Sequence, residues 1–291
     1  MDLHCVWDAK AELGEGPLWS SREQALYWVD ILQRRLHRYA LGETPRQHHW
    51  QFDEEISSAA ERMGKPGLVV TLRHGFAFFD PATEKLERLV APEAHLPGNR
   101  FNDGKCDRQG RYWAGTIDFD CKAPTGSLYR LTPDMHCEMI DSGYPVTNGP
   151  AWSADQRTMY FNDSVYGRVH AFDFDPETGN VANKRLFLQF GAGEGSPDGM
   201  TTDAEGGLWI AHWGAGKLTR HDSEGVVLMT ITLPVSQVTS CSFGGPDLST
   251  LYITSAAVGL TPAQRLAEPL AGGLFAAEPG IAGLPADMFR G

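Results

Sequence analysis

One pattern of short strands and turns recurs six times along this 291-residue chain. Each copy runs from a small-residue or Asn/Asp-Gly junction into an apolar strand, a polar turn, an aromatic-rich strand and a third strand with a basic or aromatic residue. The copies are anchored at residues 16, 57, 103, 149, 198 and 241, so successive anchors lie 41, 46, 46, 49 and 43 residues apart, and the copies at 57 and 241 are the weakest. Six units of this length, each long enough for four short strands, are typical of a β-propeller.

The third copy shows the pattern in full. Its junction is Asn102–Lys105, its turn Asp107–Gly110 and its aromatic strand Arg111–Gly115. A blade of this kind hides its apolar faces only by stacking on its neighbours. The segment His4–Trp7 lies ahead of the first copy. We expect it to form the outermost strand of the last blade and so to remove an exposed sheet edge.

We therefore predict an all-β fold, a six-bladed β-propeller with four-stranded blades in which the N-terminal strand closes the last blade. No low-complexity stretch or flexible linker divides the chain, so residues 1–291 are expected to form a single domain. A large β-sandwich is the alternative all-β fold. The chain has 32 Gly and 18 Pro, which favours tight turns over helices, and Thr261–Leu270 is the one segment expected to form a turn or two of helix.

The charge of the chain limits its partners. Its formal net charge is −12 at pH 7. Such a surface repels the phosphates of nucleic acid and an anionic membrane, so we expect neither as a partner. No apolar stretch approaches the length of a membrane span.

The cysteines and the first residues bear on the cellular compartment. Five cysteines are an odd number, and none stands in a Cys-x-x-Cys pair, which favours reduced, buried thiols over a disulfide framework or a zinc knuckle. The segment Met1–His4 begins neither a basic nor an apolar run, so we expect no signal peptide. The expected location is cytoplasmic.

Two common hydrolase motifs are absent from the sequence. There is no Gly-x-Ser-x-Gly elbow, which argues against a serine hydrolase built on an α/β sheet. There is also no His-Glu-x-x-His or other paired-histidine spacing for zinc. Any hydrolytic chemistry therefore needs a different set of side chains.

Oxygen-bearing side chains gather at the junctions of the repeat. In a propeller, residues just before the innermost strands converge on the central axis, and here they are Glu15, Asn102, Asp103, Asn148 and Asp198. Two carboxylates and an amide oxygen suit Ca²⁺, Mg²⁺ or Mn²⁺ and would tolerate Zn²⁺ or Fe²⁺. Asn-Gly and Asp-Gly are also ordinary turn dipeptides, so a turn explains any one of these residues equally well. Their recurrence at one repeat position in four units favours a metal site.

Five motifs, in order along the chain, resemble the senescence marker protein, gluconolactonase and luciferin-regenerating enzyme family. The resemblance covers essentially the whole chain, and Gly272–Phe275 is similar to the closing strand of that family. It implies a six-bladed propeller that holds a divalent metal and, in most bacterial members, hydrolyses aldonolactones. The motifs are Leu13–Trp19, Asn99–Lys105, Arg111–Thr116, Thr147–Pro150 and Ser196–Gly199.

The resemblance implies a ligand set for one divalent metal ion (Ca, Zn, Mn, Mg or Fe), namely Glu15, Asn148 and Asp198. It also gives Asp198 the catalytic acid/base role and puts a second acid, Asp103, beside the metal. A carboxylate bound to a cation has a lowered pKa and is a weaker base. Asp103 therefore stays open as the alternative catalytic base.

The same resemblance implies the contacts to substrate. Arg100 and Asn102 match the arginine and asparagine that hold the substrate. A further substrate-binding acid follows the Ala-Gly-Thr motif, and counting without gaps places it at Asp120. Asp118 competes with Asp120 for this role because the loop between residues 118 and 124 varies in length.

These residues predict metal-dependent hydrolysis of a sugar lactone, of the gluconolactone, xylonolactone or arabinonolactone type, to the aldonic acid. One alternative is another hydrolase on the same scaffold, acting on aryl esters or phosphotriesters. Its sign would be a wide aromatic-lined pocket, for which Trp213 and Phe243 are candidate lining residues. A calcium-binding or protein-binding propeller without catalysis is the other alternative. The sequence predicts no oligomeric state.

Overall fold

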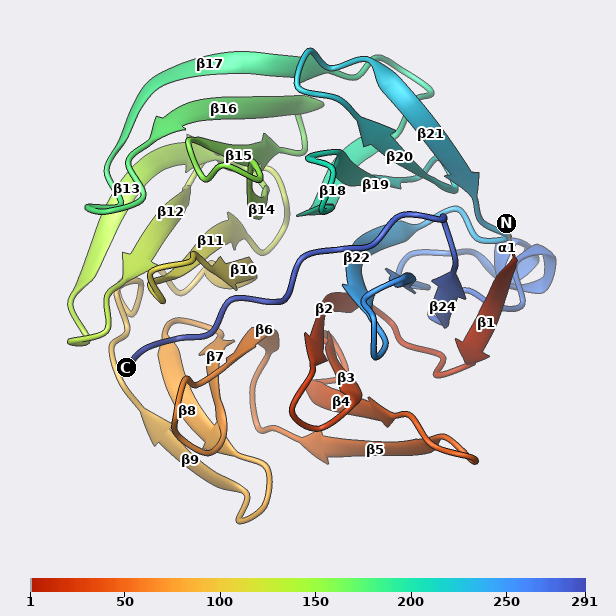
Figure 1. Cartoon of the computed structure of the whole chain (residues 1–291), viewed down its shortest axis with the longest axis horizontal. Coiled ribbons are helices and arrows are strands. Elements are labelled where there is room, and N and C mark those ends of the chain that lie inside the picture. The colour runs from red at the N-terminus through yellow and green to blue at the C-terminus, as the bar shows by residue number, and fades with distance from the viewer. Residues whose placement is uncertain (1) are drawn as a thin grey trace.

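The computed structural model describes residues 2–291 and contains six antiparallel sheets of four strands each. Figure 1 shows the sheets arranged as blades around a central axis, with one strand of each blade next to the axis. This arrangement confirms the predicted six-bladed propeller. The blades are numbered here in the order of their innermost strands.

Each of the first five blades is a run of four consecutive strands, numbered outward from the axis. Blades 1 and 2 comprise β2 (Gly14–Ser20), β3 (Ala25–Asp30), β4 (Arg35–Ala40), β5 (Arg46–Gln51), β6 (Ile56–Glu61), β7 (Leu68–Leu72), β8 (Phe76–Asp80) and β9 (Lys85–Arg88). Blades 3 and 4 comprise β10 (Asn99–Cys106), β11 (Tyr112–Asp118), β12 (Gly126–Leu131), β13 (Cys137–Tyr144), β14 (Thr147–Trp152), β15 (Thr158–Asp163), β16 (Arg168–Phe174) and β17 (Val181–Gln189). Blade 5 comprises β18 (Ser196–Thr202), β19 (Leu208–Trp213), β20 (Lys217–His221) and β21 (Val227–Thr232).

The sixth blade joins the two ends of the chain. It contains β22 (Val238–Gly244), β23 (Thr250–Ser255), β24 (Leu274–Ala277) and, as its outermost strand, β1 (Leu3–Trp7). β1 runs antiparallel to β24, with Leu3 opposite Ala277. The predicted closure by the N-terminal strand is therefore confirmed, and the two ends of the chain are held in one sheet, where β1 pairs with the edge of β24.

The core lies between neighbouring blades. The second strand of a blade has both faces covered, and all six residues of β3 are buried, whereas all four residues of the outer strand β9 are exposed. Large aromatic side chains fill the spaces between blades, as where Trp113 of blade 3 meets Trp152 of blade 4 with ring centroids 6.2 Å apart. The five cysteines form no disulfide in the structure, and Cys106 and Cys241 are buried as expected. The expected burial was wrong for Cys121, which is exposed, and Cys5 and Cys137 are only partly buried.

Every innermost strand has a register irregularity near its beginning. In β2, Glu15 pairs with Val29 and Leu18 pairs with Tyr27, so β2 contains one more residue than β3 between these two pairs. Each of the other innermost strands has one extra residue in the same way. Such a bulge re-aims the side chains around it. Gly16 and Gly149 occupy bulge positions at φ of 54° and 84°, where glycine is favoured. The expectation that the candidate ligands precede these strands was therefore wrong, because they lie within the strands, at or beside the bulges.

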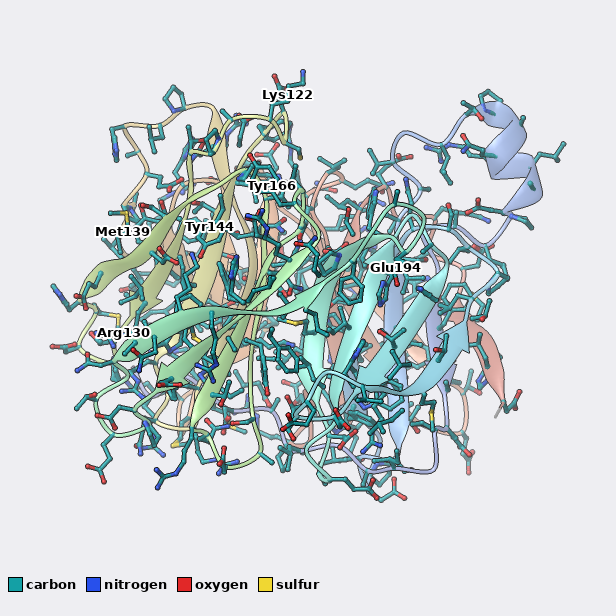
Figure 2. The ribbon with its side chains drawn as sticks, turned by 90° about the horizontal axis from the view of Figure 1, so that it is seen from above. Lys122, Arg130, Met139, Tyr144, Tyr166 and Glu194 are labelled. Atoms are coloured by element: carbon teal, nitrogen blue, oxygen red, sulfur yellow. The ribbon has the colours of Figure 1, made fainter. Side chains whose placement is uncertain are left out.

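The direction of the innermost strands defines two faces of the disk. Innermost strands begin at the face called upper here and end at the lower face. The second strand returns to the upper face, since Gly14 at the start of β2 pairs with Asp30 at the end of β3. Figure 2 shows the disk on edge, with Lys122 and Tyr166 from the upper connections of blades 3 and 4 at the same end of the molecule.

A C-terminal segment, residues 278–291, crosses the lower face (Figure 1). It bridges to blade 5 at Asp203 and Gly283 and to blade 2 at Arg62 and Phe289. Phe289 is fully buried in the core cluster of blades 2 and 3. Residues 284–287 line a small cavity of about 110 Å³ at the lower end of the central channel. The segment thus lies across that end of the channel.

Among the described residues there is one α-helix, α1 (Pro262–Ala267), which lies between β23 and β24 within the expected segment. Its N-cap Thr261 and Gln264 form a reciprocal capping box. The helix has no buried residue and a length of six residues. Among residues 2–291, no helix combines the length and apolarity that crossing a membrane requires.

Two buried aspartates hold equivalent lower-face turns in blades 3 and 5. Asp203 accepts hydrogen bonds from the Trp209 indole at 2.7 Å and from Nε of Arg220 at 2.6 Å, and it is fully buried. Asp107 does the same for Trp113 and Arg111. Each carboxylate ties a turn to the second strand of its blade and neutralises a buried guanidinium.

We predict that Asp203→Ala lowers the free energy of unfolding by about 2–4 kcal/mol, because the buried Trp209 indole loses its acceptor and Arg220 keeps only its 3.0 Å ion pair with Glu205, whose side chain is 65% exposed. Asp155→Ala changes the exposed aspartate of the corresponding blade 4 turn and should cost less than about 1 kcal/mol. Urea denaturation followed by fluorescence measures both values. Equal losses in the two variants would contradict the structural role given to Asp203.

Candidate active site

A cavity of about 430 Å³ opens at the upper face, where the innermost strands begin. Its floor is polar and is formed by Glu15 of β2, Arg100 and Asn102 of β10, Asn148 of β14 and Asp198 of β18. Each of these five residues is less than 9% exposed. The structure therefore brings together five of the residues that the sequence singled out, from four different blades.

The floor residues do not share one register position. Glu15 and Asn148 are the last paired residues before the bulges of their strands, whereas Asn102 and Asp198 lie inside the bulges. The sequence placed them all at one phase of the repeat. Because of the bulges, a residue just before the bulge in one blade and a residue inside the bulge in another can both point to the axis. The candidate residues therefore need not occupy the same position of the repeat.

A chain of hydrogen bonds orients the two amides of the floor. Nη1 of Arg100 donates to Oδ1 of Asn102 at 2.7 Å, and Nδ2 of Asn102 donates to Oδ1 of Asn148 at 2.9 Å. Nδ2 of Asn148 then donates to Oγ of Ser164 at 3.0 Å. Ser164 lines the same cavity and helps to fix which way the Asn148 amide points. Sequence reasoning missed Ser164, since a single serine after a strand carries no pattern.

Three buried carboxyl groups meet at the axis. Burial, and then the negative charge of Asp103, raises the pKa of Glu15 to about 8. Burial together with the charges of Glu15 and Asp103 raises the pKa of Asp198 well above its usual value. Burial also raises the pKa of Asp103. These groups cannot all ionise in a dry site without a compensating positive charge.

The donor set fits a hard divalent cation. Glu15 and Asp198 offer carboxylate oxygens, and Asn148 offers an amide oxygen, with no sulfur or imidazole on the floor. Across residues 2–291, no three His, Cys, Asp or Glu side chains alone form a metal-binding group. A cation held here would therefore need the amide oxygen of Asn148 as well as the two carboxylates.

Asp103 points to the other side of the axial cluster. Its carboxylate accepts hydrogen bonds from the backbone N–H groups of Gly104 at 2.8 Å and Gly149 at 3.0 Å. It lines the smaller lower cavity together with Lys105, whereas Asp198 lines the upper one. A ligand in the upper cavity therefore meets Asp198 on its floor. The assignment of the catalytic base remains a prediction.

The loop after β11 does not bring an acid to the cavity. The Asp118 carboxylate accepts hydrogen bonds from the backbone N–H groups of Lys122 and Ala123, both at 2.8 Å, and the bond from Ala123 is the main cause of its lowered pKa. Asp120 is exposed and does not line the cavity. Phe119 and Cys121, the residues next to Asp120, line it instead. The substrate contact predicted for Asp120 remains untested.

The two aromatic residues considered as pocket lining have different positions. Trp213, the last residue of β19, lines the upper cavity. Phe243 is buried between blades, with its ring centroid 5.9 Å from that of Trp209. Phe243 is thus a core residue, because its place in β22 turns it toward blade 5 and away from the axis.

The fold and the axial cluster define a six-bladed propeller with an acidic, oxygen-only site at one end of its channel. The chain belongs to the SMP-30/Gluconolactonase/LRE-like family, which it matches over residues 13–257.

Relatives extend this match to nearly full length. The chain is 36% identical to "Putative sugar lactone lactonase YvrE" of Bacillus subtilis, over 96% of this chain and 95% of the relative. It is 38% identical to regucalcin of Sus scrofa, over 99% and 98%. The crystal structure of a calcium-binding protein, regucalcin, from Agrobacterium tumefaciens superposes with a TM-score of 0.94 at 28% identity, over 98% and 96%.

We predict that Glu15→Gln stabilises the chelator-treated protein by about 1 kcal/mol, which is roughly 2–4 °C for a chain of this size. The change replaces a carboxyl group whose pKa burial raises to about 8 by an amide, which is uncharged without taking up a proton. The matched control is Glu93→Gln, since Glu93 is equally buried but accepts hydrogen bonds from Asn99, Thr116 and Tyr129. Glu93→Gln should lower the melting temperature.

Thermal melts in excess chelator measure both variants. If Glu15→Gln lowers the melting temperature as much as Glu93→Gln does, burial of the Glu15 carboxyl group does not destabilise the folded chain.

Proposed function

We propose that this protein hydrolyses sugar lactones of the gluconolactone, xylonolactone or arabinonolactone type to the aldonic acids. One divalent cation would be held by Glu15, Asn148 and Asp198. The observation that carries the proposal is the buried acidic cluster that forms the floor of a cavity beside a guanidinium and two amides. The name of the Bacillus subtilis relative supports a sugar lactone as substrate, and that of the Agrobacterium tumefaciens protein supports a calcium-type cation.

The bound cation would act as a Lewis acid toward the lactone carbonyl. Asp198 lies on the cavity floor, where its carboxylate accepts the proton of the attacking water. The acyl–oxygen bond of the ring then breaks, and the former ring oxygen takes up the proton. The product is the open-chain hydroxy acid.

Arg100 and Asn102 hold the substrate in this proposal. Both hydrogen bonds that Arg100 donates within the chain leave from Nη1, to the Phe101 carbonyl and to Asn102. Nε and Nη2 are therefore free to donate to lactone hydroxyls. Because Nη1 is anchored twice, the guanidinium plane is fixed before the substrate binds, which lowers the entropic cost of orienting it.

Removal of divalent ions should abolish the hydrolysis of gluconolactone, because the axial acids then have no cation to polarise the carbonyl. Adding back Ca²⁺, Zn²⁺, Mn²⁺, Mg²⁺ or Fe²⁺ one at a time should restore it with at least one ion. The rate is measured by acid release in a pH-indicator assay, corrected for spontaneous hydrolysis. Full activity in protein shown by elemental analysis to be free of metal would contradict the proposal.

Asp198→Asn should lower the rate of hydrolysis by about 10²–10⁴-fold even at saturating cation, since it removes a proton acceptor as well as a ligand. Glu15→Gln removes one carboxylate ligand without that proton acceptor, and excess cation should recover most of its activity. Rates measured against cation concentration separate the two effects. If excess cation fully rescues Asp198→Asn, Asp198 is a ligand alone and Asp103 becomes the candidate base.

A further inference from the structure

The wall of the upper cavity differs in chemistry from its floor. On the upper face, the end of the second strand or the connection that follows it contributes one large apolar side chain in each of five blades. We call this set the apolar collar, and its members are Leu32, Phe119, Val165, Trp213 and Val258. The floor comes from innermost strands, and the collar lies above it at the upper ends of the second strands.

The sixth connection, in blade 2, carries a cation. Arg73 follows β7, and its guanidinium lies 5.1 Å from the centre of the Phe119 ring. Arg100 lies 5.8 Å from the same ring. These contacts hold Phe119 against the mouth of the cavity although the residue is 38% exposed.

The collar offers few partners for hydroxyl groups. Above the floor, the polar side chains that line the cavity are Cys121, Ser164 and Ser196, and the Ser164 oxygen already accepts from Asn148. The nearby acid Asp118 is occupied by backbone N–H groups. A ligand hydroxyl at this height therefore has only the side chains of Ser164, Ser196 and Cys121 to replace its hydrogen bonds to water.

Apolar groups gain from the same surface. Val165 is 47% exposed and Phe119 38%, so a ligand that covers them removes apolar area from water. Trp213 adds a broad aromatic face from blade 5. The cavity therefore has a charged, hydrogen-bonding end and an apolar end, which matches a molecule with one polar head and one apolar body.

We infer that the site accepts a second class of substrate, lactones that carry an alkyl or aryl substituent on the ring. The carbonyl binds at the polar floor, and the substituent packs against the apolar collar. This inference rests on the proposed lactone hydrolysis and extends it beyond sugar lactones. The reaction is unchanged: water adds to the carbonyl carbon, the acyl–oxygen bond breaks, and the ring oxygen leaves as the hydroxyl of a hydroxy acid.

The test is a series of δ-lactones whose ring substituent grows from methyl to heptyl, assayed beside gluconolactone. The value of kcat/KM should rise about two- to fourfold per methylene until the chain passes the mouth of the cavity. Trp213→Ser and Val165→Ser remove parts of the collar and should flatten this rise. For Trp213→Ser the ratio of heptyl to methyl substrate should fall at least fivefold.

The matched control is Leu228→Ser, which changes a side chain 50% exposed on the outer strand of blade 5, away from the cavity. It should leave both the activity and the chain-length dependence as in the parent protein. Binding is measured independently of turnover with the matching δ-lactams, which are not hydrolysed. Their affinity, determined by isothermal titration with cation present, should rise along the same series.

The outcomes separate this inference from the proposed function. Turnover of gluconolactone with a flat chain-length series and flat lactam affinity overturns the apolar class and leaves the sugar lactonase intact. Rising lactam affinity without hydrolysis of any lactone supports the collar as a binding surface and overturns the proposed reaction. A rise that persists in Trp213→Ser and Val165→Ser overturns the assignment to these side chains.

Discussion

The pairing of β1 with β24 is the interaction on which the rest of this structure depends. It joins the two ends of the chain in one blade, so that blade 6 presents a complete sheet to blade 1. With the ring closed, the beginnings of the innermost strands are held at fixed distances from the axis. Glu15 and Asp198 belong to blades distant in sequence, yet they lie close enough for the charge of Glu15 to raise the pKa of Asp198. The site is therefore a property of the closed ring.

Buried aspartate and glutamate side chains accept hydrogen bonds from side-chain donors at the periphery of the propeller, whereas at the axis they face one another. Asp107, Asp203 and Glu93 are fully buried acids whose oxygens accept from indole, guanidinium, hydroxyl or amide donors. Glu15 and Asp198 are almost as buried but face each other and Asp103. The first group stabilises the turns and strands that it joins, and the second gathers carboxyl groups whose ionisation is opposed by burial and by one another. The propeller thus tolerates a destabilising centre because the interfaces around it are well satisfied.

Much of this could be predicted from residue patterns, and the rest depended on contacts between segments. All six repeat anchors lie within innermost strands, including those of the two weakest copies at Ser57 and Cys241. The alternation of apolar strands and polar turns recurs in these copies although their junction motif differs. Four of the five floor residues, Glu15, Asn102, Asn148 and Asp198, could be found because oxygen donors at repeat junctions converge on an axis. Arg100 was found through the family resemblance alone. Ser164 could not be found, since its role comes from one hydrogen bond to Asn148. The positions of Asp118 and Asp120 outside the upper cavity depend on a loop conformation that the spacing of residues along the sequence does not predict.

The C-terminal segment lies across the lower end of the central channel. Residues 284–287 leave a cavity of about 110 Å³ beneath the axial cluster, against about 430 Å³ above it. In the proposed reaction, substrate would enter and product would leave through the larger, upper cavity, so the two would compete for one passage. The hydroxy acid of that reaction would carry a negative charge beside an acidic floor, and repulsion would favour its departure toward the mouth. A short terminal segment that contributes nothing to the floor would in this way set the direction of traffic.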